Sequence, residues 1–153
     1  DDDPVALLPA LSPDVSIVHV QKADALGNFS IEGFSTHEPE MIKGSKAVIV
    51  SCEELVDTEY FRDSPNETTV PYLFVDAVVH QPFGGYPTSV YRYYEHDREH
   101  LTQYQRIARA GGSTYADYLD RAIYQPRDFT GFLDWALTDE KRTLLQNEMN
   151  QIL

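Results

Sequence analysis

Within the first ninety residues, short segments alternate apolar and polar positions, the pattern of β-strands with one buried face. Strands are expected over Ser16–Val20 and Phe29–Gly33, joined by the turn residues Ala25–Asn28. The continuous apolar run Ala47–Val50 predicts a strand buried on both faces of a parallel sheet. Another strand is expected over Phe74–Val79, where β-branched residues recur. This part of the chain is therefore predicted to form a sheet.

The period lengthens to three or four residues from about Glu95, which indicates amphipathic helices. The first helix is expected to end at Gly111–Gly112, and the second to be capped by one of the hydroxyl residues Ser113–Thr114. A last helical region is expected over Phe129–Leu153, with Thr138 as a further cap. The C-terminal part of the chain is predicted to be helical.

Because a continuous apolar strand such as Ala47–Val50 is typical of parallel sheets, we predict an α/β fold with an open, mainly parallel sheet in residues 1–94 and a helical layer in residues 95–153. The length of 153 residues is that of about one ordinary domain. The chain opens with Asp1-Asp2-Asp3-Pro4, without a Met, and runs at once into an apolar segment. We therefore expect a segment from the interior of a longer protein.

Charge and cysteine content narrow the possible partners. The formal net charge of −13 argues against nucleic acid, whose binding depends on clustered Lys and Arg. No apolar run approaches the roughly 20 residues needed to cross a bilayer, and no signal peptide is visible. The single cysteine, Cys52, cannot form an internal disulfide, which fits a reducing compartment. The predicted location is the cytoplasm.

Five blocks of sequence resemble a known family when they are taken in order. They are Pro13-Asp14-Val15 with the following strand that carries His19, Ala23-Asp24-Ala25-Leu26-Gly27-Asn28, Val48-Ile49-Val50 with Glu53-Glu54-Leu55-Val56-Asp57, Val75-Asp76-Ala77-Val78-Val79, and Pro82-Phe83-Gly84-Gly85-Tyr86-Pro87-Thr88-Ser89, with Tyr93-Tyr94 and Asp97 beyond. This series resembles the C-terminal half of the alpha (A) subunit of family I coenzyme A transferases, in the glutaconate CoA-transferase branch. The likeness extends over about residues 5–100.

The resemblance implies a reaction that moves CoA between an acyl-CoA and a carboxylic acid, such as a dicarboxylic or oxo acid. In this family a glutamate attacks the acyl-CoA and carries CoA as a thioester, which is covalent catalysis by a carboxylate. In the glutaconate type the partner beta subunit supplies that glutamate, and the glycine-rich "GGFG"-like loop belongs to the N-terminal half of the alpha subunit. Neither motif is present in this sequence, so no catalytic residue is expected in it. The expected partners are a beta subunit, the missing N-terminal half and the two substrates. No permanently bound cofactor is expected.

The loop at Gly84, Gly85 and Tyr86 is the candidate for substrate binding. It follows a predicted strand, and open α/β sheets bind ligands beyond the carboxyl ends of their strands. The alternative is a loop with a structural role alone. Glu53 and Glu54 also follow a buried strand. A pair at a strand end, with one carboxylate exposed and the other salt-bridged or capping, explains them without catalysis.

Two other interpretations of the chain remain open. Related members of this branch are carbon–carbon hydrolases that open rings of CoA thioesters in steroid catabolism, and the residues present do not distinguish them from transferases. The chain could instead be a non-catalytic interaction domain.

The segment His96–His100 has the spacing H-x-x-E-H of some zinc proteases. Because zinc needs a third protein ligand and nothing in the sequence places one nearby, a solvated helix face is expected there and no metal site.

Overall fold

The computed structural model describes residue 4 and residues 6–152; Asp1–Asp3, Val5 and Leu153 lie outside the described residues, and with them most of the acidic opening of the chain. The chain divides into two compact units, residues 1–84 and residues 85–153, and each is described by itself. Across the described residues, no helix combines the length and the apolar character that crossing a membrane requires.

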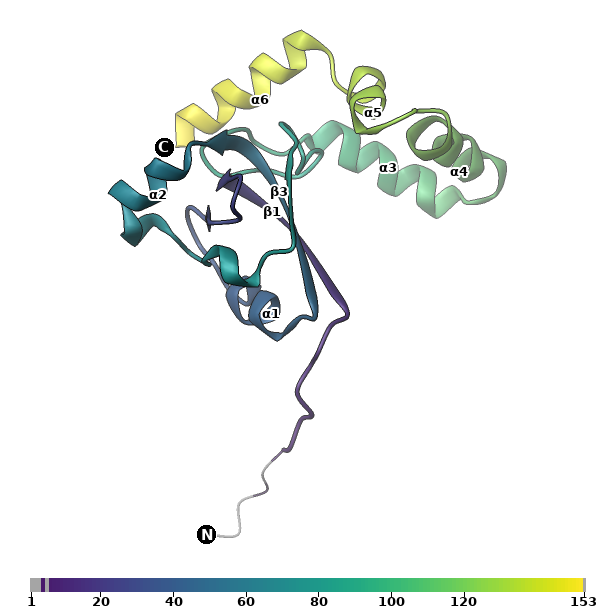
Figure 1. Cartoon of the computed structure of the whole chain (residues 1–153). Coiled ribbons are helices and arrows are strands. Elements are labelled where there is room, and N and C mark those ends of the chain that lie inside the picture. Colours follow the sequence, from purple (N-terminus) through teal and green to yellow (C-terminus); the bar gives the residue numbers. More distant parts are fainter. Residues whose placement is uncertain (1–3, 5, 153) are drawn as a thin grey trace. The chain divides into compact units, whose positions relative to one another are not determined.

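The first unit is built on an open four-stranded sheet. Its strands are β1 (Val15–Asp24), β2 (Phe29–Ser30), β3 (Ala47–Val56) and β4 (Ala77–His80), in the spatial order β2-β1-β3-β4. The β1–β3 and β3–β4 pairs are parallel, and only the short β2 is antiparallel to its neighbour. Figure 1 shows β1 and β3 running alongside each other. The predicted α/β fold with a mainly parallel sheet is confirmed.

One face of this sheet carries the hydrophobic core. Val20, Val48 and Val50 are each at most 1% exposed. Helix α1 (Glu38–Gly44) adds Ile42 to the same cluster. Burial of a side chain of this size contributes about 1.5–3 kcal/mol, so this face supplies most of the unit's hydrophobic stabilisation.

The opposite face of the sheet is only partly covered. Ile17 is 70% exposed and Val79 is 45% exposed, while Ile49 between them is partly exposed. The expectation that Ala47–Val50 is buried on both faces is therefore not met within the described chain. The physical reason is that Val48 and Val50 point into the core, whereas Ala47 and Ile49 point to the other face.

The turn between β1 and β2 depends on the carboxylate of Asp24, which is fully buried. Its Oδ1 accepts hydrogen bonds from the backbone N–H groups of Leu26 (3.0 Å), Gly27 (2.9 Å) and Asn28 (2.9 Å). Its Oδ2 accepts from Nδ2 of Asn28 at 2.7 Å. Gly27 has φ +109°, and a Cβ there would lie 2.9 Å from Cβ of Val75. The block Ala23–Asn28 is thus explained by a tight turn, as the sequence predicted.

The remainder of this unit departs from the prediction in several places. The strand predicted over Phe29–Gly33 is limited to Phe29–Ser30. Helix α2 (Thr58–Asp63) was not foreseen, although Asp57 caps it by accepting from Glu59 N at 3.0 Å. The predicted strand Phe74–Val79 begins only at Ala77, because the preceding residues form a 3₁₀ turn over Tyr72–Phe74. A second 3₁₀ turn spans Pro65–Glu67.

The second unit is helical, as predicted. Its elements are α3 (Arg98–Ala110), α4 (Gly112–Leu119), the π-helical turn η3 (Asp120–Tyr124), α5 (Phe129–Ala136) and α6 (Asp139–Ile152). Thr138 caps α6, since its Oγ1 accepts from Lys141 N at 3.3 Å. The predicted cap at Ser113–Thr114 is wrong. The helix already starts at Gly112, because Gly111 adopts φ +63° and serves as the cap residue.

Candidate functional site

The carboxyl ends of β1, β3 and β4 lie together because the three strands are parallel. This is the edge at which open α/β sheets bind ligands. Directly after β4, Gln81 N donates to the carbonyl of Cys52 at 2.9 Å, and Gly84 N donates back to the carbonyl of Gln81 at 3.0 Å. The chain therefore makes a tight loop over residues 81–84 at this edge, which brings the first residue of the predicted substrate loop, Gly84, to the expected position.

Beneath this loop, the imidazole of His19 is held between two side chains of β3. Its Nε2 lies 2.7 Å from Oε1 of Glu53, and its Nδ1 lies 2.8 Å from Oγ of Ser51. The side chains of His19 and Glu53 are 15% and 3% exposed. Both ring nitrogens thus have a protein partner, so the ring has one defined orientation.

The second oxygen of Glu53 holds the loop itself. Oε2 accepts from the backbone N–H of Phe83 at 2.7 Å, and Phe83 is buried with φ +59°. The neighbouring Glu54 is exposed. The predicted pair of one exposed and one salt-bridged or capping carboxylate is confirmed, and Glu53, paired with His19, is the second member.

Gly84 packs directly on the imidazole of His19. A Cβ at this position would lie 2.5 Å from Cε1 and 2.7 Å from Nδ1 of His19, and 2.8 Å from the carbonyl oxygen of Gln81. A Cβ atom essentially never makes non-bonded contacts shorter than 3.0 Å, and the last of these contacts involves backbone. The position therefore accepts glycine alone without rearrangement.

The other two predicted loop residues belong to the helical unit. Gly85 N donates to the hydroxyl of Tyr94 at 2.9 Å. Tyr86 is only 5% exposed, and its hydroxyl donates to Oδ2 of Asp97 at 2.8 Å. Burial and the Asp97 carboxylate raise the pKa of Tyr86, so the phenol stays protonated at any physiological pH. Tyr86 is thus an anchor inside the helical unit, and a role for these residues in substrate binding remains a prediction.

Asp97 is the polar centre of this anchor. Burial would raise the pKa of its carboxyl, but hydrogen bonds from the His100 N–H, Lys141 and Tyr86 outweigh it and lower the pKa. Lys141 Nζ lies 2.9 Å from Oδ2 of Asp97, and the carboxylate side chain is 2% exposed. The buried charge is paired, as buried charges must be.

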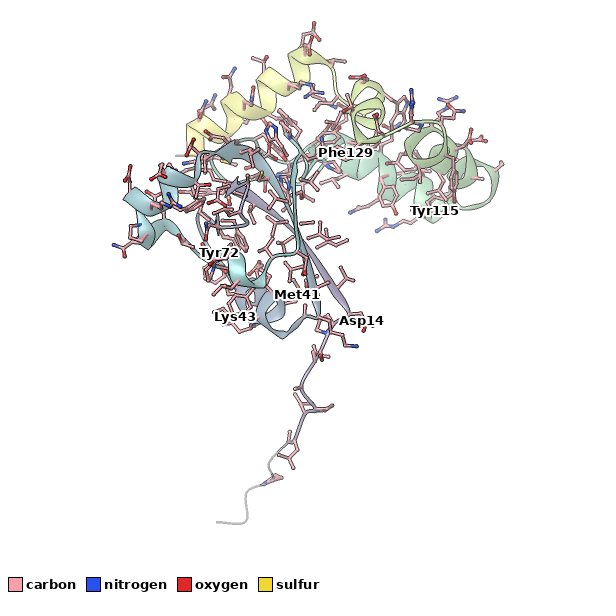
Figure 2. All side chains as sticks on the ribbon, in the orientation of Figure 1. Asp14, Met41, Lys43, Tyr72, Tyr115 and Phe129 are labelled. Carbon is pink, nitrogen blue, oxygen red and sulfur yellow. The ribbon has the colours of Figure 1, made fainter. Side chains whose placement is uncertain are left out.

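An aromatic cluster surrounds His100 in the same unit. The ring of His100 makes edge contacts with Tyr86, Tyr118 and Trp135, at centroid distances of 5.5, 6.2 and 6.1 Å. Its Nε2 lies 3.0 Å from the Tyr118 hydroxyl. Figure 2 shows the side chains of this unit, with Tyr115 on α4 and Phe129 at the start of α5. The predicted solvated face is thus wrong for His100, because its ring packs among aromatic rings.

The histidines of the H-x-x-E-H segment have different partners. His96 is hydrogen-bonded to Glu95, whereas His100 packs in the aromatic cluster. Among residue 4 and residues 6–152, no group of three or more His, Cys, Asp or Glu side chains is placed to hold a metal ion. A zinc site needs at least three protein ligands, and the two histidines of the H-x-x-E-H segment, His96 and His100, supply only two.

A cavity of about 710 Å³ in the helical unit is a poor match for an acidic substrate. Carboxylates outnumber the cationic side chains Arg98 and Lys141 in its lining, which would repel carboxylic acids and the phosphates of CoA alike. The acidic lining residues are Glu95, Asp97, Glu99 and Glu148.

Sequence reasoning missed the group formed by His19, Ser51 and Glu53. The signal was present but weak, because the strand pattern places positions 19 and 51 on one face without revealing that they are neighbours. The register that pairs His19 with Ser51 emerges only when β1 and β3 are aligned.

The chain is similar to known proteins over most of its length. The sequence profile of the family described as Coenzyme A transferase matches residues 3–81. The A subunit of glutaconate CoA-transferase from Acidaminococcus fermentans is 32% identical over 105 residues, which are 69% of this chain and 33% of that protein. The A subunit of 3-oxoadipate CoA-transferase from Pseudomonas knackmussii is 33% identical over 128 residues, 84% of this chain and 44% of that protein.

Solved structures agree with the sequence relatives. The crystal structure of the A. fermentans glutaconate coenzyme A transferase matches with a TM-score of 0.86 and 27% identity, covering 90% of this chain and 43% of that one. A variant of the decarboxylase AibA/AibB matches with a TM-score of 0.63 and 32% identity over 76% of this chain and 41% of that one. The chain thus spans a third to under a half of the length of these relatives. It belongs to the coenzyme A transferase family.

Proposed function

We propose that this chain forms part of the alpha subunit of a cytoplasmic CoA-transferase that moves CoA from an acyl-CoA to a carboxylic acid. The observation that carries the proposal is the combined sequence and structural likeness to the A subunit of glutaconate CoA-transferase. The relatives are named for glutaconate and 3-oxoadipate, which are both dicarboxylates. A dicarboxylic or oxo acid is therefore the proposed acceptor.

The proposed chemistry needs a carboxylate nucleophile that this chain does not provide. The glutamate attacks the acyl-CoA to form an anhydride and release CoA thiolate, which then attacks the glutamyl carbonyl and releases the first acid. The second acid reverses these steps and leaves as the new acyl-CoA. Within this chain Glu53 already accepts hydrogen bonds through both oxygens and is 3% exposed, so it is not suited to attack a substrate. The nucleophile is assigned to the beta subunit.

The contribution of this chain is a framework and a loop. The loop over Gln81–Gly84 stands at the carboxyl ends of three parallel strands, where it can line a substrate cleft. The half-exposed sheet face with Ile17 and Val79 is proposed to be covered by the remainder of the same subunit, since parallel sheets are normally covered on both faces.

An exchange assay tests this function. The full-length gene product would be co-purified with its proposed B-type partner subunit and given acetyl-CoA or succinyl-CoA with a panel of dicarboxylic and oxo acids. Formation of the acceptor's CoA thioester is the expected result. A complex that is fully assembled and produces no new thioester with any acid would contradict the proposal.

A second candidate function is cleavage of a carbon–carbon bond in a CoA thioester, as in the ring-opening hydrolases of this branch. The structural similarity to the decarboxylase AibA/AibB supports this second candidate, because a decarboxylase with a similar fold also breaks a carbon–carbon bond. The same assay separates the two. A bond-cleaving enzyme converts its CoA thioester without any acceptor acid, whereas a transferase requires one.

A further inference from the structure

Two ionisable side chains from neighbouring strands are buried together at the edge of the sheet that carries the candidate loop. His19 and Glu53 lie 2.7 Å apart, with 15% and 3% of their side chains exposed. Replacing such a buried polar pair with apolar side chains is often neutral or stabilising, so stability alone is a weak reason to keep one. The contacts that these two residues make with the loop offer a better reason for the presence of the pair.

Glu53 fixes the backbone of the loop at a strained residue. Phe83 is not a glycine, yet it adopts φ +59°, the left-handed region that side chains disfavour. Its N–H donates to the second oxygen of Glu53 at 2.7 Å in a buried setting. Strained backbone of this kind persists only where its surroundings hold it, and it clusters at functional sites.

His19 fixes the next residue by contact. A Cβ added to Gly84 would lie only 2.5 Å from Cε1 of the imidazole, so the loop rests directly on the ring. Ser51 holds the ring from its other nitrogen at 2.8 Å. Hydrogen bonds to both nitrogens prevent the ring from turning away, and the loop therefore has a rigid floor.

We propose that Ser51, His19 and Glu53 form a positioning latch that sets the loop over residues 81–84 in the geometry that substrate requires. The two contacts hold consecutive residues of the loop. Glu53 holds Phe83 through a hydrogen bond, and His19 supports Gly84 through packing. The three side chains act through the loop and not on the reacting atoms, so they are positioning residues. The nature of the substrate rests on the proposed function, whereas the latch itself rests on the contacts described above.

The kinetic test uses the assembled complex of the full-length subunit with its partner. A shift of a loop by about 1 Å can cost about 10²-fold in rate, so His19→Ala and Glu53→Ala are expected to lower kcat/KM by about that factor, mainly through kcat. Glu53→Gln keeps an acceptor for Phe83 and a group for His19, and should recover activity to within about tenfold of the wild type. Glu54→Ala, at the exposed neighbouring position, is the matched control and should leave kcat/KM unchanged.

A double substitution separates a latch from a general loss of structure. Gly84→Ala alone forces its Cβ onto the ring. His19→Ala removes two of the three shortest contacts of that Cβ, those with Cε1 and Nδ1, and leaves the one with the Gln81 carbonyl. The double variant should therefore lose much less than the product of the two single losses. Independent losses that multiply, or kcat/KM unchanged per folded complex while the melting temperature falls, would overturn the proposal.

Hydrogen exchange provides a readout that does not depend on the reaction. The amide of Phe83 should be protected in the wild type and exchange at least tenfold faster in Glu53→Ala, with no change in Glu54→Ala. Unchanged exchange at Phe83 would show that Glu53 does not hold the loop. If the wild-type complex exchanges no CoA but Phe83 behaves as expected, the proposed function fails and the latch stands.

Discussion

Replacing Asp24 with asparagine tests the role of charge in the β1–β2 turn, because the substitution changes charge and one donor while keeping the shape. The carboxylate accepts three backbone N–H groups at 2.9–3.0 Å and the Asn28 amide at 2.7 Å, all in a fully buried position. An asparagine would accept the three backbone groups as a neutral and weaker acceptor. Its own NH₂ would face the NH₂ of Asn28, where two donors meet without an acceptor.

Rotating the Asn28 amide would not relieve this conflict, since its Oδ1 already accepts from the N–H of Tyr72 at 3.1 Å. Hydrogen bonds to a charged group contribute about 1.5–3 kcal/mol each, and a buried unsatisfied donor costs about 1–3 kcal/mol. The loss of one such bond and the weakening of three predict that Asp24→Asn lowers the free energy of unfolding by about 3 kcal/mol.

Urea unfolding of the purified protein, followed by circular dichroism, measures this change. The midpoint should fall while the slope of free energy against urea stays the same, because the surface exposed on unfolding does not change. Asp63→Asn, at an exposed position on α2, is the control and should shift the free energy by less than about 0.5 kcal/mol. A loss below about 1 kcal/mol for Asp24→Asn would refute the view that the carboxylate charge organises the turn.

Three further predictions concern charges and the thiol. Lys141→Met should destabilise the protein by about 3 kcal/mol in urea melts, because it leaves the buried carboxylate of Asp97 without a cationic partner. Lys46→Met is the control and should have almost no effect, because the ion pair of Lys46 with Asp14 is largely exposed. Equal losses of stability in the two variants would contradict this distinction between buried and exposed pairs. Burial lowers the pKa of His100, so the unfolded chain binds more protons below about pH 6.5. Stability should therefore fall from pH 7 to pH 5, and His100→Gln should flatten that slope, while an unchanged slope would show that other groups cause it. Burial raises the pKa of Cys52 to about 11, so a thiol reagent should label it only after denaturation, and stoichiometric labelling of the native protein would disprove its burial.

Much of the sheet could be predicted because its signals are local. The alternation around Val18 and the apolar run at Ala47–Val50 identify the two central strands, and the residues of the Asp24 turn carry their own hydrogen-bonding chemistry. The extension of β1 to Asp24 could not be seen, because residues Gln21–Lys22 are polar. That part of the strand is stabilised by pairing with the end of β3, where Lys22 lies opposite Glu54.

The candidate site was predictable only in part for the same reason. Gly84 could be placed on a loop after a strand, but its dependence on His19 arises from a contact between residues 65 positions apart in the chain. The burial of Tyr86 follows from its hydrogen bond to Asp97 and from the aromatic rings around it, none of which its own sequence neighbours reveal. Motif resemblance located the loop, and the register of the sheet showed what holds it.

The most direct test of the central claim is to find which carboxylate carries CoA during turnover. The assembled complex of the full-length subunit and its partner would be incubated with acyl-CoA alone, the enzyme-bound thioester trapped with hydroxylamine, and the modified glutamate located by peptide mass spectrometry. We expect a hydroxamate on a glutamate of the partner and unmodified carboxylates throughout this chain, Glu53 included. A stoichiometric hydroxamate on Glu53, or on any other residue of this chain, would contradict the claim that the nucleophile lies in the partner.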